Sequence, residues 1–109
     1  MAVVSNIYAD AGTDFSASIT VTDSSGTVAN LTGYTAAAMA RRTYTSTTSY
    51  PFSASVSNAS GGVVTLTMTD TLTDTMSGRY VYDCEITAPN GTKTRVIEGM
   101  MEVSPGVTR

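Results

Sequence analysis

Hydrophobic and polar residues alternate along several stretches of this chain, the pattern of a β-strand with one buried face. In residues 14–23, DFSASITVTD, every second position from Phe15 to Val21 is apolar, and the positions between are Ser or Thr. The alternation recurs over 50–58, 63–70, 79–87 and 95–103, and we expect another strand near 3–8. The inward positions predict a core that includes Phe15, Ile19, Val21, Leu66, Tyr80, Tyr82, Cys84, Ile86 and Ile97.

The segments between these strands read as turns, with one ambiguous region. The alternation of Ala with other residues over 36–41 fits a strand or a helix, and we favour a strand because Gly33 and the flanking Thr residues oppose a helix. Residues 43–50 then form a polar loop, and 24–26 and 58–62 form turns. Asp70 is expected to cap one helical turn that buries Leu72 and Met76 and ends at Gly78.

The last two strands can be aligned from the sequence Asn90-Gly91, a strong signal for a two-residue type I′ hairpin turn. This register places Cys84 opposite Ile97, Tyr82 opposite Gly99 and Tyr80 opposite Met101. On the outer face it pairs Arg79 with Glu102. It also pairs Asp83 with Glu98, and like charges directly opposite each other destabilise a sheet.

Seven short strands separated by turns predict a single all-β domain over residues 1–109, an immunoglobulin-like β-sandwich of about seven antiparallel strands. Composition agrees, since Ser and Thr make up 33 of the 109 residues and Leu only 3. Tyr82 precedes Cys84 by two residues, as in immunoglobulin domains, but the chain has no second cysteine. We therefore expect no disulfide, with Cys84 filling a core position as a small apolar side chain.

Charge and hydropathy narrow the classes of partner. A net charge of −3 argues against nucleic acid, which requires clustered Lys and Arg. No apolar run approaches the roughly 20 residues that span a bilayer, so we expect no membrane partner. The first ten residues lack the features of a signal peptide. These features predict a chain that folds in a reducing cytosol.

No residue stands out as catalytic, cofactor-binding or metal-binding. The chain has no His, so a Ser–His or Cys–His pair is excluded. Asp83 and Glu98 could form a metal or acid–base pair, but a solvated face or a salt bridge to a partner's Arg is the favoured interpretation. Three Asn-x-Ser/Thr sequences, which begin at Asn30, Asn58 and Asn90, are better explained as turns than as glycosylation sites.

One cluster of basic and aromatic residues suggests a protein contact. Arg41, Arg42, Tyr44 and Tyr50 lie in or beside the polar loop, and Arg and Tyr are enriched in interface hot spots. An ordinary loop is the alternative. The hypothesis is an interface formed by this cluster, with Asp83 and Glu98 as the complementary surface that a neighbouring molecule's arginines would contact.

The chain resembles a group of small virion proteins of tailed bacteriophages. The resemblance is carried by Asp14-Phe15, LTGYT at 31–35, Arg41-Arg42, GRYVYDCEI at 78–86 and VSPGVTR at 103–109. The chain is also similar to the immunoglobulin-like N-terminal domains of phage baseplate proteins, which belong to longer chains.

The resemblance implies a non-enzymatic structural protein of a tail or baseplate. Such a protein is made in the host cytoplasm, resides in the virion, and packs in multiple copies against other phage virion proteins. A capsid decoration protein and a glycan-binding host-attachment module are the alternatives. No cofactor is expected.

Overall fold

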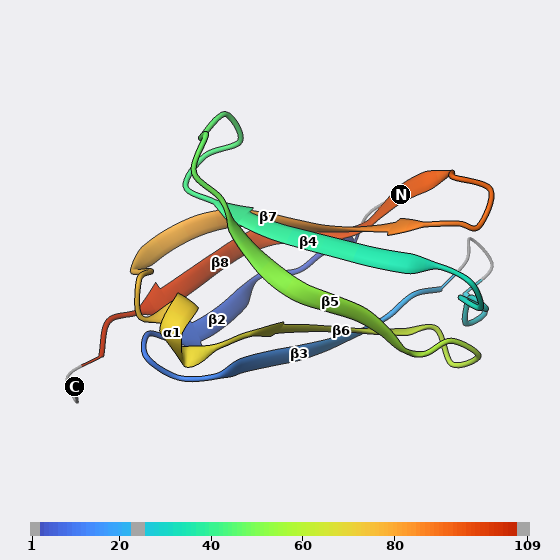
Figure 1. The fold of residues 1–109 in the computed structure, drawn as a ribbon, viewed down its shortest axis with the longest axis horizontal. Helices are drawn as coiled ribbons and strands as arrows, with labels where there is room; N and C mark the ends of the chain where they lie inside the picture. The colour runs from blue at the N-terminus through green and yellow to red at the C-terminus, as the bar shows by residue number, and fades with distance from the viewer. Residues whose placement is uncertain (1–2, 23–25, 107–109) are drawn as a thin grey trace.

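Eight strands and one helical turn make up the part of the chain that the computed structural model describes, residues 3–22 and 26–106 (Figure 1). The elements are β1 (Val3–Val4), β2 (Ile7–Asp10), β3 (Phe15–Thr20), β4 (Thr35–Arg41), β5 (Tyr50–Asn58), β6 (Val63–Met68), α1 (Asp70–Thr73), β7 (Gly78–Thr87) and β8 (Lys93–Ser104). The turn predicted at 24–26 lies mostly outside the described residues. The expected strand over the Ala-rich segment is confirmed as β4.

The strands form two facing layers that β5 joins into one path. The first layer contains β1 and β2 beside β8, followed by β7 and β4, and the second contains β5, β6 and β3. The start of β5 pairs with β4 through Tyr50–Phe52, whereas its remainder pairs with β6. The expected all-β fold is therefore confirmed, and the sheet curls far enough to approach a closed barrel (Figure 1).

The N-terminal strand differs from the prediction in two ways. It is split into β1 and β2, and both run parallel to β8, so the first layer is mixed rather than purely antiparallel. The split lies at Ser5 and Asn6, opposite Gly99. A Cβ atom at Gly99 would clash with the backbone carbonyl of Ser5, so the absence of a side chain there lets the N-terminal segment lie against β8.

The core lies between the two layers and contains most of the residues predicted for it. Six of the nine are buried, from Cys84 at 0% exposed to Ile97 at 7%, while Phe15, Ile19 and Val21 are partly buried against the same cluster. Aromatic rings connect the layers, because Phe52 packs against Phe15 at 5.9 Å and against Tyr82 at 6.2 Å between ring centroids. The fully buried Ala40, Val64, Leu66, Met76, Tyr80, Met101 and Val103 complete the centre.

The β7–β8 hairpin has the predicted pairs, but its turn is different. Cys84 pairs with Ile97, Tyr82 with Gly99 and Tyr80 with Met101, as expected. The loop has three central residues, since Ala88 pairs with Thr92 and only Gly91 has a positive φ, so the predicted type I′ turn is wrong. A bulge at Val96 adds one residue to β8 and restores the predicted register beyond it.

The helical turn is present at the predicted place, with a different cap. Thr69, not Asp70, is the N-cap, and its hydroxyl accepts a hydrogen bond from the backbone N–H of Leu72. Met76 is buried and Leu72 partly buried as expected, whereas Gly78 begins β7 instead of ending the helix. No helix in the described ranges is long and apolar enough to cross a membrane.

All three Asn-x-Ser/Thr sequences lie in turns. The side-chain oxygen of each Asn accepts a hydrogen bond from a backbone N–H two or three residues later: Thr32 for Asn30, Gly61 for Asn58 and Thr92 for Asn90, each at 3.0 Å. This side-chain bond to the following backbone is the feature that makes Asn a turn residue. It explains the recurrence of the pattern without glycosylation.

Candidate functional site

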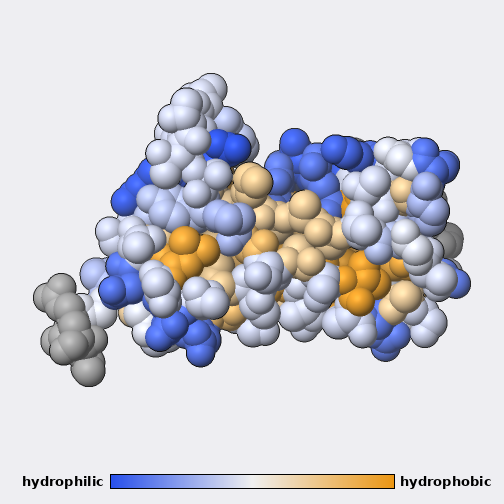
Figure 2. All heavy atoms as spheres, viewed as in Figure 1, coloured by the Kyte–Doolittle hydropathy of each residue, from blue (hydrophilic) through white to orange (hydrophobic). Residues whose placement is uncertain are grey.

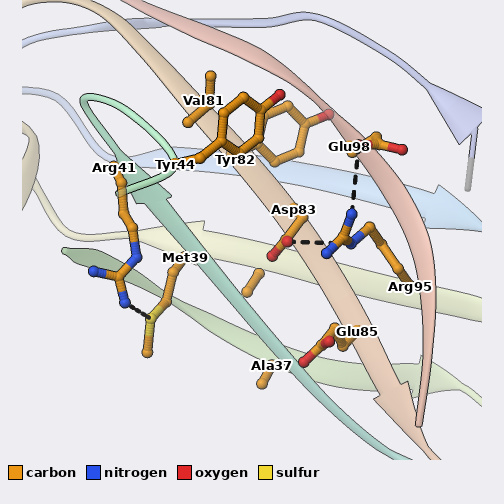
Figure 3. Close-up of a pocket in the computed structure, with 11 residues that line it drawn as sticks. Ala37, Met39, Arg41, Tyr44, Val81, Tyr82, Asp83, Glu85, Arg95 and Glu98 are labelled. Atoms are coloured by element: carbon orange, nitrogen blue, oxygen red, sulfur yellow. Dashed lines mark hydrogen bonds and ion pairs between the residues drawn. The ribbon is translucent and has the colours of Figure 1, made fainter. Parts of the chain in front are cut away.

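The outer face of the first layer carries a groove of about 330 Å³ (Figure 3). Its floor is apolar and formed by Ala37, Met39 and Val81 on β4 and β7. The loop between β4 and β5 rises along one side, and charged side chains of β7 and β8 form the other. In the space-filling view, a hollow separates the protruding loop from a group of hydrophilic side chains (Figure 2).

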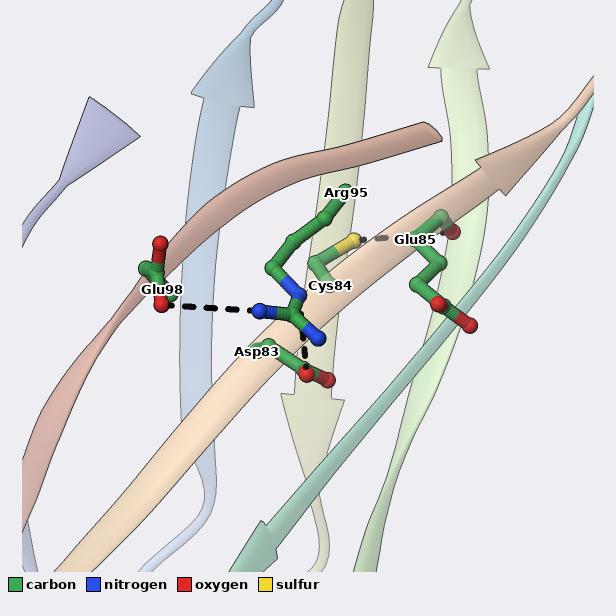
Figure 4. Close-up of polar contacts among 5 residues, drawn as sticks. All are labelled: Asp83, Cys84, Glu85, Arg95 and Glu98. Carbon is green, nitrogen blue, oxygen red and sulfur yellow. Dashed lines mark hydrogen bonds and ion pairs between the residues drawn. The ribbon is translucent and has the colours of Figure 1, made fainter. Parts of the chain in front are cut away.

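Asp83 and Glu98 lie opposite each other on the charged side of the groove, as predicted. Arg95 joins them, with its Nε atom 3.3 Å from Asp83 Oδ2 and its Nη1 atom 3.7 Å from Glu98 Oε1 (Figure 4). The three side chains are between 34% and 49% exposed, so the two ion pairs are screened by water. The repulsion expected between the two carboxylates is therefore relieved within the chain, and no arginine from a neighbouring molecule is needed.

The bulge at Val96 explains why Arg95 can reach both carboxylates. In a regular strand Arg95 would point inward, because it is an odd number of residues from Glu98. The extra residue reverses the alternation, so Arg95 pairs with Glu85 and lies on the outer face. Arg95 is not predictable as a residue of this site from the sequence, because a bulge of this kind leaves no clear signal in the hydrophobic pattern.

Arg41 and Tyr44 form the opposite side of the groove (Figure 3). Arg41 extends along the loop, and its Nη1 atom donates a hydrogen bond to the backbone oxygen of Ser46 at 2.6 Å. Its Nη2 atom lies 3.9 Å from the sulfur of Met39. Tyr44 is 80% exposed, the highest value among the exposed large hydrophobic residues of the described chain. Arg41 is thus held in place by its own loop, while Tyr44 is free to contact another molecule.

Arg42 and Tyr50 do not line this groove. Arg42 donates a hydrogen bond to the backbone oxygen of Arg79 at 3.2 Å, and its guanidinium lies 4.3 Å from the centre of the Tyr80 ring. Tyr50 is partly buried and meets Tyr80 edge to face at 5.3 Å. The predicted cluster of four loop residues is therefore divided, because adjacent residues such as Arg41 and Arg42 point in opposite directions.

Glu85 is a further residue of the groove that the sequence analysis did not single out. It lies on β7 beside Arg95 and is partly buried. Its carboxylate makes no ion pair within the described residues, where Arg95 binds Asp83 and Glu98 instead. A partly buried carboxylate without a cation is available to a charged group from outside.

Cys84 lies directly beneath this surface, on the inward side of β7. It is fully buried, and burial raises the pKa of its thiol to about 11, with further contributions from the carboxylates of Asp83 and Glu85. The thiol is therefore protonated at neutral pH, and a protonated buried thiol is a poor nucleophile. This arrangement agrees with the expected role of Cys84 as a core residue.

The groove combines an apolar floor, an exposed tyrosine and charges of both signs. Comparisons with protein-family models and with curated proteins find no match for this sequence. In chemical terms the surface is suited to protein contact, because aromatic and Arg side chains around an apolar centre are typical of interfaces. Of the six residues predicted for an interface, four line the groove: Arg41, Tyr44, Asp83 and Glu98.

Proposed function

We propose that this chain is a non-enzymatic structural protein of a tailed-phage virion, a tail or baseplate component that packs against other virion proteins. The virion assignment rests on the resemblance of the sequence to phage virion proteins. The assembly role is supported by the outer face of the first layer. A protein that assembles with others needs a surface whose burial against another protein is favourable, and this face meets that requirement.

One observation carries the assembly role: exposed apolar side chains gather on this face. The large hydrophobic residues that are exposed in the described chain number six, and five of them lie on this face or its rim. They are Val4, Tyr8, Met39, Tyr44 and Met100, on β1, β2, β4, the β4–β5 loop and β8. The outer face of the second layer carries Ser and Thr instead, among them Ser16, Ser53 and Thr67. Concentration of apolar area on one side marks that side for contact.

The location can be tested by labelling purified phage particles with an antibody against this chain and viewing them by electron microscopy. Label at the tail or baseplate is the expected result. Label over the capsid shell would replace the tail assignment with a capsid decoration role. Absence of the chain from particles, checked by mass spectrometry of their proteins, would overturn the virion assignment.

The surface can be tested by following the incorporation of variants into particles. Tyr44→Ser is expected to reduce the copy number, since it removes the most exposed aromatic ring beside the groove. Val28→Ser is the matched control, because Val28 is 43% exposed but lies outside the groove. Incorporation of both variants at the wild-type level would rule out the groove as the contact.

A further inference from the structure

The outer face of β4, β7 and β8 carries balanced charges on an acidic protein. Four basic and four acidic side chains lie there: Arg41, Arg79, Lys93 and Arg95, with Asp83, Glu85, Glu98 and Glu102. Of the other charged residues of the described chain, Asp10 lies at the rim of this face on β2, whereas Asp14, Asp70, Asp74 and Arg42 lie elsewhere, so most of the acidic excess is away from this face. Two copies of an acidic chain can therefore meet through this face with little net repulsion.

Five of these eight charges have no ionic partner within the described chain. Arg95 bridges Asp83 and Glu98, whereas Arg79, Glu85, Lys93 and Glu102 make no ion pair there, and Arg41 bonds only to a backbone oxygen of its own loop. Three of these five are cations and two are anions. Unpaired charges of both signs suit a self-complementary surface, because one copy can supply partners that the other lacks.

We propose that this face binds the same face of a second copy, across a two-fold axis that runs parallel to the strands between β7 and β8. This rotation lays β7 of one copy over β8 of the other. Each outward residue then faces the residue that is its cross-strand neighbour in its own chain. Arg79 faces Glu102 of the second copy, and Val81 faces Met100.

Other contacts of this arrangement also fit, although Lys93 faces the uncharged Thr87 and gains no ionic partner. Glu85, which has no cation of its own, faces Arg95 of the second copy. Asp83 faces Glu98, but each of these carboxylates is already bound to an Arg95. The rotation also brings the protruding β4–β5 loop toward the β2 edge of the other copy, so that Tyr44, 80% exposed, approaches Tyr8, 69% exposed.

The size of the face suits a weak, reversible dimer. With the edge formed by β1 and β2 included, the face is four strands wide, and the outward positions from Arg79 to Thr87 give its length. At the usual strand spacing it covers roughly 20 Å by 27 Å, or about 500 Å² in projection. Stable interfaces commonly cover about 800 Å² of each partner, and smaller ones are transient. A dimer that forms as the concentration rises is the expected behaviour.

The inference deepens the proposed assembly function and rests on the same face, but it is tested on the isolated chain. Sedimentation velocity over a wide concentration range should show the mass rising from monomer to dimer. Arg79→Glu and Glu102→Arg should each weaken the dimer by about tenfold or more, because each places like charges opposite each other twice. An equimolar mixture of the two variants should dimerise again, because both contacts between positions 79 and 102 then join opposite charges in the mixed dimer.

Ser55→Glu is the matched control, since Ser55 is exposed on the outer face of the second layer and should leave dimerisation unchanged. Circular dichroism verifies that each variant is folded, and Met100→Gln provides a second disruption without added charge. A wild-type monomer at every concentration, or a dimer insensitive to both charge reversals, would overturn the proposal. A mixture that stays monomeric would overturn the two-fold arrangement. None of these outcomes bears on whether the chain is found in virions.

Discussion

The hydroxyl of Tyr82 donates a hydrogen bond to the backbone carbonyl oxygen of Ser5 across 2.5 Å, joining residues 77 positions apart. The ring of Tyr82 lies on β7, passes the bare backbone of Gly99 on β8, and reaches the break between β1 and β2. Burial raises the pKa of this hydroxyl, so it remains a donor at neutral pH. This bond adds a side-chain link between the N-terminal segment and the core, beside the pairing of β1 and β2 with β8.

Tyr82→Phe should lower the free energy of unfolding by about 0.5–1.5 kcal/mol, because it removes one hydrogen bond and leaves the ring in place. Urea unfolding measures this change, and hydrogen exchange should become faster in β1 and β2 before it changes elsewhere. Tyr44→Phe is the control, since Tyr44 is exposed. Uniformly unchanged exchange at residues 3–10 would show that the bond does not hold these strands.

Gly99→Ala should destabilise the protein by about 1–3 kcal/mol, the usual cost of forcing an extra methyl group into a packed site. The added Cβ would collide with backbone, the carbonyl of Ser5, which cannot move aside as a flexible side chain would. The expected result is displacement of β1 and β2, visible in amide chemical shifts of residues 3–10. Wild-type stability and shifts would mean that the N-terminal segment lies elsewhere.

Arg95→Gln should cost more stability than Lys93→Gln, although both remove one positive charge. Arg95 separates the carboxylates of Asp83 and Glu98, whereas Lys93 makes no ion pair in the described chain. Because the pairs are partly exposed, the difference should be at most about 1 kcal/mol and should shrink as salt is added. Chemical unfolding of dilute protein at low and high salt measures it. Equal losses for the two variants would contradict the bridging role.

Cys84 should react slowly with alkylating agents at neutral pH in the folded protein, because its thiol is buried and protonated. Rapid native-state alkylation, at the rate seen in denaturant, would show that the site is open. Cys84→Ser should cost about 1–3 kcal/mol, since it buries a hydroxyl in place of an apolar group. Cys84→Ala should cost less than the serine variant.

The same residue predicts a loss of stability at alkaline pH. The folded-state pKa is about 11, above the ordinary value of 9.0, so the unfolded chain releases the proton first as pH rises. The stability that this difference in pKa contributes to the folded state is complete below about pH 9 and is lost progressively toward pH 11. Cys84→Ala should therefore show a smaller decline than wild type across this window. Identical pH profiles for the two proteins would contradict the raised pKa.

Part of the candidate interface could be predicted from the sequence and part could not. The facing of Asp83 and Glu98 follows from the hairpin register, which was correct beyond the bulge even though the turn was not. The separation of Arg42 from Arg41 follows from strand alternation and could have been foreseen. Arg95 could not have been found, since its outward position depends on the bulge at Val96.

The sequence by itself determined which residues form strands and which face of each strand is buried. Alternation with a period of two leaves one arrangement that buries Leu66, Tyr82 and Cys84 together, because a shift of one residue would expose them all. Only the tertiary structure decided that β1 and β2 run parallel to β8 and that β5 connects the layers. These features depend on contacts between distant segments, such as Ser5 over Gly99, which no local pattern encodes.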